Sequence, residues 1–239
     1  MNDILSILAA AAGGLLPALA WLWFWLREDS KHPEPRRLIA LAFLAGMISV
    51  AIAVPLELGI KAFLETGFLG AWLATSVVVY AAWSALEELV KYAMAYMTVL
   101  YRRDDDEPID PVIYMVTVAL GFAGAENVLF LLSPLAGNTV AQTIATGDLR
   151  FVGATLLHVV CSAVIGVALG LTFYSSRVVH YTVGFIGVLL AMGLHIGFNY
   201  LILNTPPEFI LRTFSLVWVG VIFLLAILEY IKRIRPRNA

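Results

Sequence analysis

A long apolar run, residues 72–100, reads WLATSVVVYAAWSALEELVKYAMAYMTVL and carries Glu87, Glu88 and Lys91 near its centre. About 20 mostly apolar residues are enough for a helix to span a bilayer. A charged side chain in the middle of such a helix costs roughly 2.5–3.5 kcal/mol, and intramembrane ionisable residues usually serve a function. One lysine cannot neutralise two glutamates. The run therefore predicts a spanning helix whose remaining carboxylate meets partners from other helices or faces a polar cavity.

The whole chain has the composition of a membrane protein. Its 239 residues are 61% hydrophobic and only 13% charged, whereas the apolar share of a soluble domain is about one half. No polar stretch is long enough for a separate soluble domain, so we expect residues 1–239 to form a single transmembrane helical domain. The net charge of −2 gives no basic surface for nucleic acid, and the single cysteine, Cys161, excludes an intrachain disulfide.

Apolar stretches of spanning length predict an all-α, polytopic bundle of about seven transmembrane helices. The connection at residues 60–72 is interrupted by glycine and follows a proline, so we expect either a loop or a short re-entrant segment there. The predicted spans are residues 4–26, 38–58, 72–100, 111–132, 149–174, 181–203 and 209–230.

Lysine and arginine side chains in the connecting loops segregate to one side of the predicted bundle. Only Lys61, Arg150 and Arg212 fall on the opposite side. Because the cytoplasmic loops of membrane proteins carry the excess of positive charge, we expect the N-terminus outside and the C-terminus in the cytoplasm. The eleven residues on the cytoplasmic side are Arg27, Lys31, Arg36, Arg37, Arg102, Arg103, Arg177, Lys232, Arg233, Arg235 and Arg237.

Polar side chains also occur inside the next three predicted helices. Glu126 and Asn127 are adjacent in the fourth, His158 lies in the fifth, and His195 and Asn199 are one helical turn apart in the sixth. Counted from the predicted helix ends, Glu126 and the two histidines lie at a similar depth, about six to nine residues from the outer boundary. We therefore expect them to meet the charged residues of the third helix in one buried cavity. Small residues beside them allow close helix packing; these are Gly121, Gly124, Ala125, Gly166, Gly170, Gly193 and Gly197.

In this order, these polar motifs resemble the PrsW family of intramembrane proteases, which shares a superfamily with the CAAX prenyl endopeptidases. The match consists of Glu-Glu-x-x-Lys at 87–91, Gly-Phe-x-x-x-Glu-Asn at 121–127, and the later His158 and His195. Some family members have aspartate four residues after the last histidine, where this chain has Asn199. The resemblance implies a multi-pass protein of a prokaryotic cytoplasmic membrane that cleaves a single-span membrane protein. The family's best-known activity is site-1 cleavage of a membrane-anchored anti-sigma factor.

Peptide hydrolysis needs an activated water and a group that stabilises the oxyanion. We expect Glu87 or Glu88 to act as general base. The two histidines, with Glu126, then either bind a divalent metal such as zinc or polarise the carbonyl directly. No HExxH motif signals a metal site, so both mechanisms stay open. The expected catalytic residues are Glu87, Glu88, Lys91, Glu126, Asn127 and Asn199, and the expected metal ligands are His158, His195 and Glu126.

Two other functions also account for buried ionisable groups. A proton-coupled transporter or channel uses such residues as a relay, but it would favour paired half-sequences and broken helices, which the sequence does not display. A non-catalytic membrane scaffold would tolerate apolar residues in place of Glu87, Glu88 and His195. The expected partners are thus a single-span protein substrate and the lipid bilayer.

Overall fold

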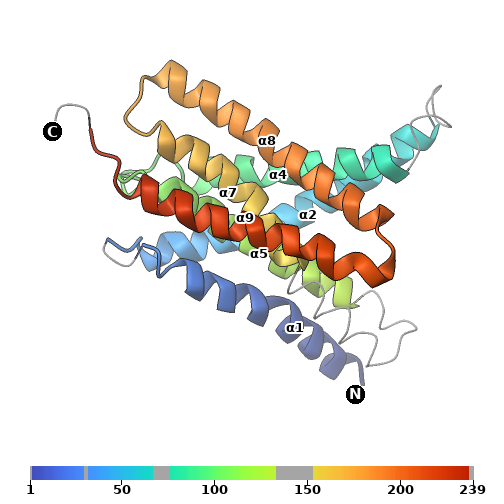
Figure 1. Cartoon of the computed structure of the whole chain (residues 1–239). Helices are drawn as coiled ribbons and strands as arrows, with labels where there is room; N and C mark the ends of the chain where they lie inside the picture. Colours follow the sequence, from blue (N-terminus) through green and yellow to red (C-terminus); the bar gives the residue numbers. More distant parts are fainter. Residues whose placement is uncertain (1, 30–31, 67–75, 133–152, 237–239) are drawn as a thin grey trace.

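The computed structural model describes residues 2–29, 32–66, 76–132 and 153–236, and over these ranges the protein is a bundle of α-helices (Figure 1). The all-α prediction and the predicted number of seven helices are both confirmed. The elements are α1 (Asn2–Trp25), α2 (Arg36–Thr66), α4 (Ser76–Thr98), α5 (Asp110–Leu132), α7 (Thr155–Leu171), α8 (Arg177–Asn204), the 3₁₀ turn η3 (Pro207–Phe209) and α9 (Ile210–Ile231).

Five helices, α1, α2, α5, α8 and α9, are long and apolar enough to cross a membrane. α4 has comparable length but carries the three central charges described above. α7 is shorter, with 17 residues from Thr155 to Leu171. Its predicted start at residue 149 lies outside the described residues.

α5 lies at the centre of the bundle, where it packs against α1, α2, α4 and α7. Its residues from Asp110 to Gly124 are all buried. α7 also packs against α8 and α9, and α4 packs against α2 and α8. α4 contacts α5, α7 and α8, and α7 contacts α5 and α8, so the four helices that carry the polar motifs surround one part of the core.

Two glycines set the distance between α2 and α5. A Cβ atom added to Gly121 would lie 2.0 Å from the carbonyl oxygen of Phe43, and one added to Gly46 would lie 2.0 Å from the carbonyl oxygen of Val118. Only a residue without a side chain allows the two backbones to approach this closely. The prediction of close packing at Gly121 is confirmed.

The same prediction is wrong for Gly193 and Gly197 on α8. A Cβ atom at either position would meet nothing within 4 Å. Two residues along a helix correspond to a rotation of about 200°, so both glycines lie on the face of α8 turned away from His195, and that face is exposed. Small residues next to a buried polar group need not share its side of the helix.

α2 is longer than predicted, because it continues beyond Pro55 to Thr66. Residues 60–66 of the expected loop or re-entrant segment are thus part of a continuous helix, and residues 67–72 lie outside the described residues. Near this end of α2, Lys61 Nζ lies 3.9 Å from an Oε1 of Glu65, one turn further on.

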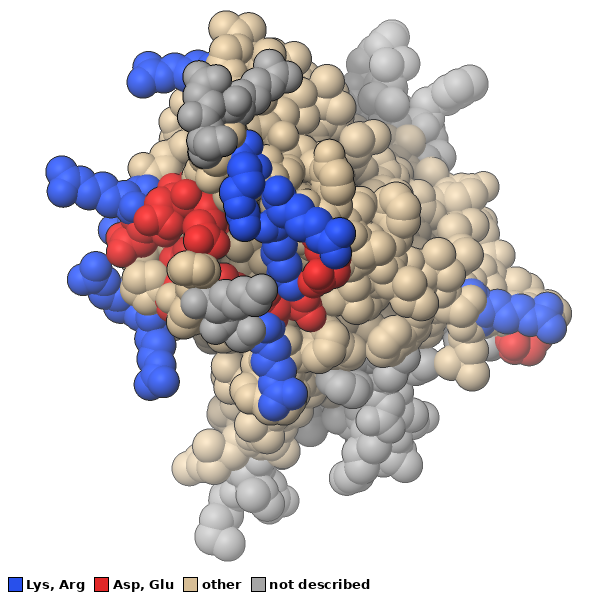
Figure 2. Space-filling view, turned by 60° about the vertical axis from the view of Figure 1, so that its left-hand side comes forward, with Lys and Arg blue, Asp and Glu red and all other residues tan. Residues whose placement is uncertain are grey.

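Figure 2 shows charged side chains gathered at one end of the bundle, left of its centre, and this is the end on the left in Figure 1. We call this the charged end; among the described residues it consists of residues 26–29, 32–35, 99–109, 172–176 and 232–236. Lys232 Nζ lies 2.7 Å from Glu28 Oε2 there, and an Arg37 nitrogen lies 3.9 Å from Asp104 Oδ1. The segregation of basic residues agrees with the predicted pattern, while the side of the membrane that this end faces stays a prediction.

Candidate active site

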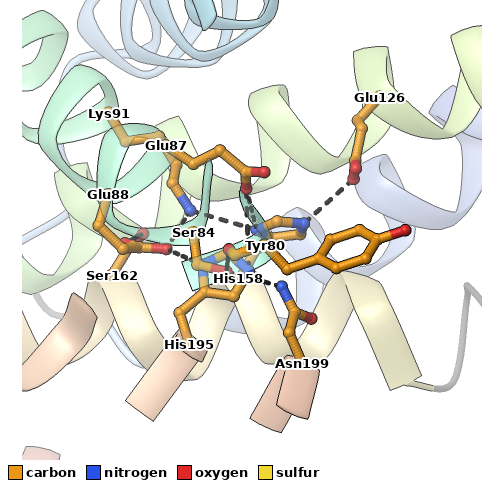
Figure 3. A network of polar contacts seen from close by, with 10 residues as sticks. All are labelled: Tyr80, Ser84, Glu87, Glu88, Lys91, Glu126, His158, Ser162, His195 and Asn199. Atoms are coloured by element: carbon orange, nitrogen blue, oxygen red, sulfur yellow. Dashed lines mark hydrogen bonds and ion pairs between the residues drawn. The ribbon is translucent and has the colours of Figure 1, made fainter. Parts of the chain in front are cut away.

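Polar side chains from α4, α5, α7 and α8 form one connected network in the bundle (Figure 3). α4 contributes Glu87, Glu88 and Lys91, because positions three and four apart share a helix face. Glu126 from α5 and His158 from α7 complete one side of the network. His195 from α8 closes the other side. The charges that seemed costly in the apolar run thus have partners from other helices.

Glu88 is the fully buried centre of this network. Its Oε1 atom lies 2.8 Å from His195 Nδ1 and is also in contact with Lys91 Nζ. Its Oε2 atom accepts a hydrogen bond of 2.8 Å from the Ser162 hydroxyl. Because both oxygens are engaged, Glu88 is suited to hold other side chains in place.

Lys91 is also fully buried and carries positive charge into the site. Its Nζ atom contacts Glu88, lies 3.2 Å from His158 Nδ1 and sits 4.9 Å from the centre of the Phe122 ring. A buried ion pair is stable only when further hydrogen bonds satisfy both partners, and these contacts provide them.

The two histidine rings lie next to each other, with their centres 5.0 Å apart and their planes at 85°. His158 Nε2 lies 3.1 Å from Glu126 Oε2, and the Glu126 side chain is 31% exposed, compared with 4% for His158. His158 is in the first turn of α7. It is therefore nearer to the start of the described helix than the predicted span 149–174 indicated.

Glu87 points one oxygen toward both histidines. Its Oε2 atom is buried and has no hydrogen-bond partner among the described residues. The same atom lies 3.8 Å from His158 Nδ1 and 3.8 Å from His195 Nε2. A buried carboxylate oxygen without a partner is costly, so this arrangement calls for a group that binds all three side chains.

These three side chains could hold a metal ion, since their ligand atoms all lie within 4.8 Å of one another. Two histidines and one glutamate are a known donor set for catalytic zinc. In such sites the second nitrogen of each histidine usually bonds to a carboxylate or carbonyl. That condition is met here, because His195 Nδ1 bonds to Glu88 and His158 Nε2 bonds to Glu126.

The ligand set expected from the sequence contained Glu126, whereas the group that the structure brings together contains Glu87. Glu126 instead contacts the nitrogen of His158 that faces away from Glu87. The part that each carboxylate plays in the reaction stays a prediction.

Asn127 and Asn199 bond to side chains of neighbouring helices. Asn127 Nδ2 donates to Thr155 Oγ1 at 3.0 Å, which connects α5 to the start of α7. Asn199 Nδ2 donates to Ser84 Oγ at 2.8 Å, and Ser84 in turn donates to the backbone carbonyl of Tyr80. These bonds fix the helices around the site, and the expected catalytic role of the two asparagines stays a prediction.

One acidic residue near the site was not expected. The Glu57 carboxyl group on α2 lies close enough to Glu87 and Glu126 to interact with both, and its backbone carbonyl accepts a 2.9 Å hydrogen bond from Trp83 Nε1. The sequence contained little signal for it, because an acid at the end of the predicted span 38–58 costs less than the acids at the centre of α4.

Comparisons with known proteins agree with the resemblance of the motifs. A family model described as the PrsW family intramembrane metalloprotease matches residues 34–228. The protease PrsW of Bacillus subtilis is 30% identical over 169 residues, which are 71% of this chain and 68% of that protein. The protease PrsW of Halalkalibacterium halodurans is 28% identical over 172 residues, 72% of this chain and 69% of that protein.

A further relative, the protease PrsW of Geobacillus kaustophilus, is 27% identical over 135 residues, and that alignment spans only 56% of each protein. No solved structure matches the chain. The family match covers most of the chain and includes all four helices that carry the buried network. This chain therefore belongs to the PrsW family of intramembrane metalloproteases.

Proposed function

We propose that the protein is a metal-dependent endopeptidase that hydrolyses a peptide bond of a single-span membrane protein inside the bilayer. The observation that carries the proposal is the buried Glu87 Oε2 atom, which has no hydrogen-bond partner among the described residues and lies 3.8 Å from a nitrogen of each histidine. A buried carboxylate oxygen without a partner is costly, and a bound cation would remove that cost.

Glu87, His158 through Nδ1 and His195 through Nε2 would hold a divalent cation, and zinc suits this donor set. When bound, such an ion polarises the peptide carbonyl and acidifies a water molecule. Lys91 Nζ lies 3.2 Å from the same His158 nitrogen. A metal ion at Nδ1 would displace this contact, so the Lys91 ammonium group would then depend on its contact with Glu88.

Glu126 is the carboxylate that we assign as general base. Its side chain is 31% exposed, compared with 12% for Glu87 and 0% for Glu88, so it is the one most accessible to water and to a substrate. A carboxylate in this position takes a proton from the attacking water and delivers it to the leaving amine. In the structure Glu126 Oε2 is bonded to His158 Nε2, the nitrogen that faces away from Glu87, so proton transfer would require the Glu126 side chain to turn from His158 toward the water.

The depth of the site supports cleavage in the half of the membrane away from the charged end. Glu126 lies six residues before the end of α5 at Leu132, and His195 lies nine residues before the end of α8 at Asn204. If the charged end faces the cytoplasm, these positions are in the extracytoplasmic half. A membrane-anchored anti-sigma factor is the substrate class that the family resemblance implies.

The test uses the purified protein in detergent with a single-span test substrate. We expect a chelator to abolish cleavage by the wild type and zinc to restore it. Glu87→Gln should lose both bound metal and activity. With zinc in excess, Glu126→Gln should still bind metal, at an affinity lowered about 10- to 100-fold by loss of its bond to His158, while cleavage falls by about 10²- to 10⁴-fold, as for loss of a general base.

The matched control is Glu65→Gln, which removes an exposed acid at the end of α2 and should leave both metal content and cleavage unchanged. Wild-type rates of cleavage in Glu87→Gln and Glu126→Gln would refute the proteolytic mechanism. Full activity of a metal-free preparation would refute the metal dependence but not the proteolytic function.

A further inference from the structure

A cavity lies at the charged end of the bundle, apart from the buried network. Its volume is about 530 Å³, and it is formed where α4 ends, α5 begins and the turn between α7 and α8 passes. Its lining includes Tyr101, Arg102, Asp105 and Arg177. Because the ends of spanning helices meet the bilayer surface, this cavity lies at the level of lipid headgroups.

Two guanidinium groups at this cavity lack an acidic partner. Arg102 and Arg177 are exposed, and neither forms an ion pair with any acidic residue that the structure describes. Other basic residues at the same end do form ion pairs, Arg37 with Asp104 and Lys232 with Glu28. A guanidinium group binds phosphate oxygens through two parallel N–H donors. Arg102 and Arg177 are therefore available to bind a phosphate group in this cavity.

Asp105 offers an acceptor in the same lining. Its Oδ2 atom accepts a 2.7 Å hydrogen bond from the backbone N–H of Tyr101, whereas its buried Oδ1 atom has no partner among the described residues. Burial raises the pKa of Asp105 to about 6. A hydroxyl donor from a ligand would satisfy this oxygen.

The wall of the cavity is held in an unusual backbone conformation. Tyr101 has φ of 62°, in the left-handed region that bulky residues rarely occupy. Its hydroxyl lies 3.2 Å from His180 Nε2, and His180 Nδ1 lies 3.2 Å from the Thr172 hydroxyl. Such backbone strain persists only where the surroundings enforce it, and it is often found at binding sites.

The aromatic rings around Tyr101 suit a membrane surface. Its ring centre lies 5.3 Å from that of Tyr96 and 6.1 Å from that of Tyr181, and all three side chains are partly exposed. Tyrosines with one polar and one apolar side are typical of the headgroup level. The cavity therefore combines a phosphate-binding part with an apolar rim for the glycerol and acyl portion of a lipid.

We propose that this cavity binds the headgroup of an anionic phospholipid, with the phosphate between Arg102 and Arg177 and a headgroup hydroxyl donating to Asp105. Phosphatidylglycerol has this chemistry, since it carries a singly charged phosphodiester and two free hydroxyls. Basic pockets between the ends of membrane helices are a known means of holding anionic headgroups.

The test measures which lipids remain bound when the detergent-purified protein is mixed with equal amounts of phosphatidylglycerol, phosphatidylmethanol and phosphatidylcholine. Native mass spectrometry counts the retained molecules. We expect phosphatidylglycerol to exceed phosphatidylcholine by about 30-fold, which corresponds to two cationic contacts of about 1 kcal/mol each. Phosphatidylmethanol, a phosphodiester without a hydroxyl, should lie between them.

The double variant Arg102→Gln/Arg177→Gln should lower phosphatidylglycerol to the level of phosphatidylcholine. The matched control Arg36→Gln/Arg103→Gln removes the same charge from exposed positions at the same end that do not line the cavity, and it should keep the preference. The proposed lipid site would be wrong if Arg102→Gln/Arg177→Gln kept the preference for phosphatidylglycerol, or if the control variant lost it to the same extent.

Soluble glycerol 3-phosphate distinguishes a lipid from a free phosphate ester. At a concentration equal to that of the lipid, it should not displace phosphatidylglycerol, because it lacks acyl chains to occupy the apolar rim. Displacement would overturn the assignment to a lipid. Equal retention of phosphatidylmethanol and phosphatidylglycerol by the wild type would overturn the role of Asp105.

Discussion

The Nδ1 atom of His195 lies 2.8 Å from Oε1 of Glu88, which fixes the imidazole ring and leaves its Nε2 atom directed at Glu87. A carboxylate bound to the far nitrogen of a histidine sets its tautomer and makes it a better metal ligand. We therefore propose that Glu88 acts on the site through His195, as a positioning residue, while the Glu87 oxygen faces both histidines.

Replacing Glu88 tests this division of roles. Glu88→Gln keeps the shape but removes the counter-ion of the buried Lys91. Loss of an orienting carboxylate lowers metal affinity about 10- to 100-fold, and an unpaired buried charge costs roughly 3–5 kcal/mol. We expect weaker zinc binding in a competition titration and a lower thermal midpoint.

A second substitution separates the two effects. The double variant Glu88→Gln/Lys91→Met removes the unpaired charge, so stability should recover while zinc affinity stays low. Ser162→Ala, which deletes only one donor to Glu88, should change zinc affinity much less. Wild-type zinc affinity in Glu88→Gln would contradict the positioning role.

The convergence of α4, α5, α7 and α8 was predictable because each buried charge in an apolar run must find partners. Which of Glu87 and Glu88 faces the two histidines could not be predicted. Adjacent residues point about 100° apart around a helix, and the rotation of α4 is set by its packing against α2, α5 and α8. Spacing within one helix carries no information about that rotation.

The exposed face of α8 illustrates the same limit. Gly193 and Gly197 flank His195 in sequence, yet they face away from the network, whereas Gly121 contacts the backbone of α2. The position of Glu57 near the site was not predicted, because α2 was expected to end near residue 58 and this acid therefore seemed to lie at the boundary of the span. The helix continues to Thr66, so Glu57 lies inside it and reaches the site.

Two glycine substitutions provide a matched test of helix packing. Gly121→Ala places a methyl group 2.0 Å from the Phe43 carbonyl oxygen, on a backbone that cannot move aside alone. Overpacking of this kind costs about 1–3 kcal/mol or more. Gly197→Ala meets open space and should gain up to about 1 kcal/mol of helix propensity. Thermal unfolding in detergent compares them; equal midpoints would contradict the close contact between α2 and α5.

A cluster of carboxyl groups at the charged end should make stability depend on pH. Burial raises the pKa of Glu34 from 4.5 to about 7, and burial likewise raises the pKa of Asp29 to about 6. Glu34 accepts a hydrogen bond from the Tyr114 hydroxyl, and its backbone N–H donates to Asp29 at 3.0 Å. The folded state thus binds protons more tightly than the unfolded state.

The contribution of such groups is present at low pH and is lost as pH rises through the folded-state pKa. We expect a higher thermal midpoint at pH 5.5 than at pH 8, with Glu34 accounting for about 1–2 kcal/mol, or roughly 2–8 °C. Glu34→Gln, which stays neutral, should reduce this difference by raising the midpoint at pH 8. The exposed control Glu65→Gln should leave the difference between pH 5.5 and pH 8 unchanged. If Glu34→Gln shows the same difference as the wild type, Glu34 is not the group responsible for it.

The orientation of the bundle decides on which side of the membrane cleavage takes place. Lys61 and Arg103 are exposed near opposite ends of the bundle, and the single native cysteine, Cys161, is buried. Because the charged end should face the cytoplasm, a membrane-impermeant maleimide should label Lys61→Cys in intact cells and Arg103→Cys only after lysis. The unsubstituted chain should stay unlabelled in both conditions. The reverse pattern would place the site in the cytoplasmic half of the bilayer, so that an extracytoplasmic cleavage site on the substrate would be ruled out even if the metal-dependent chemistry held.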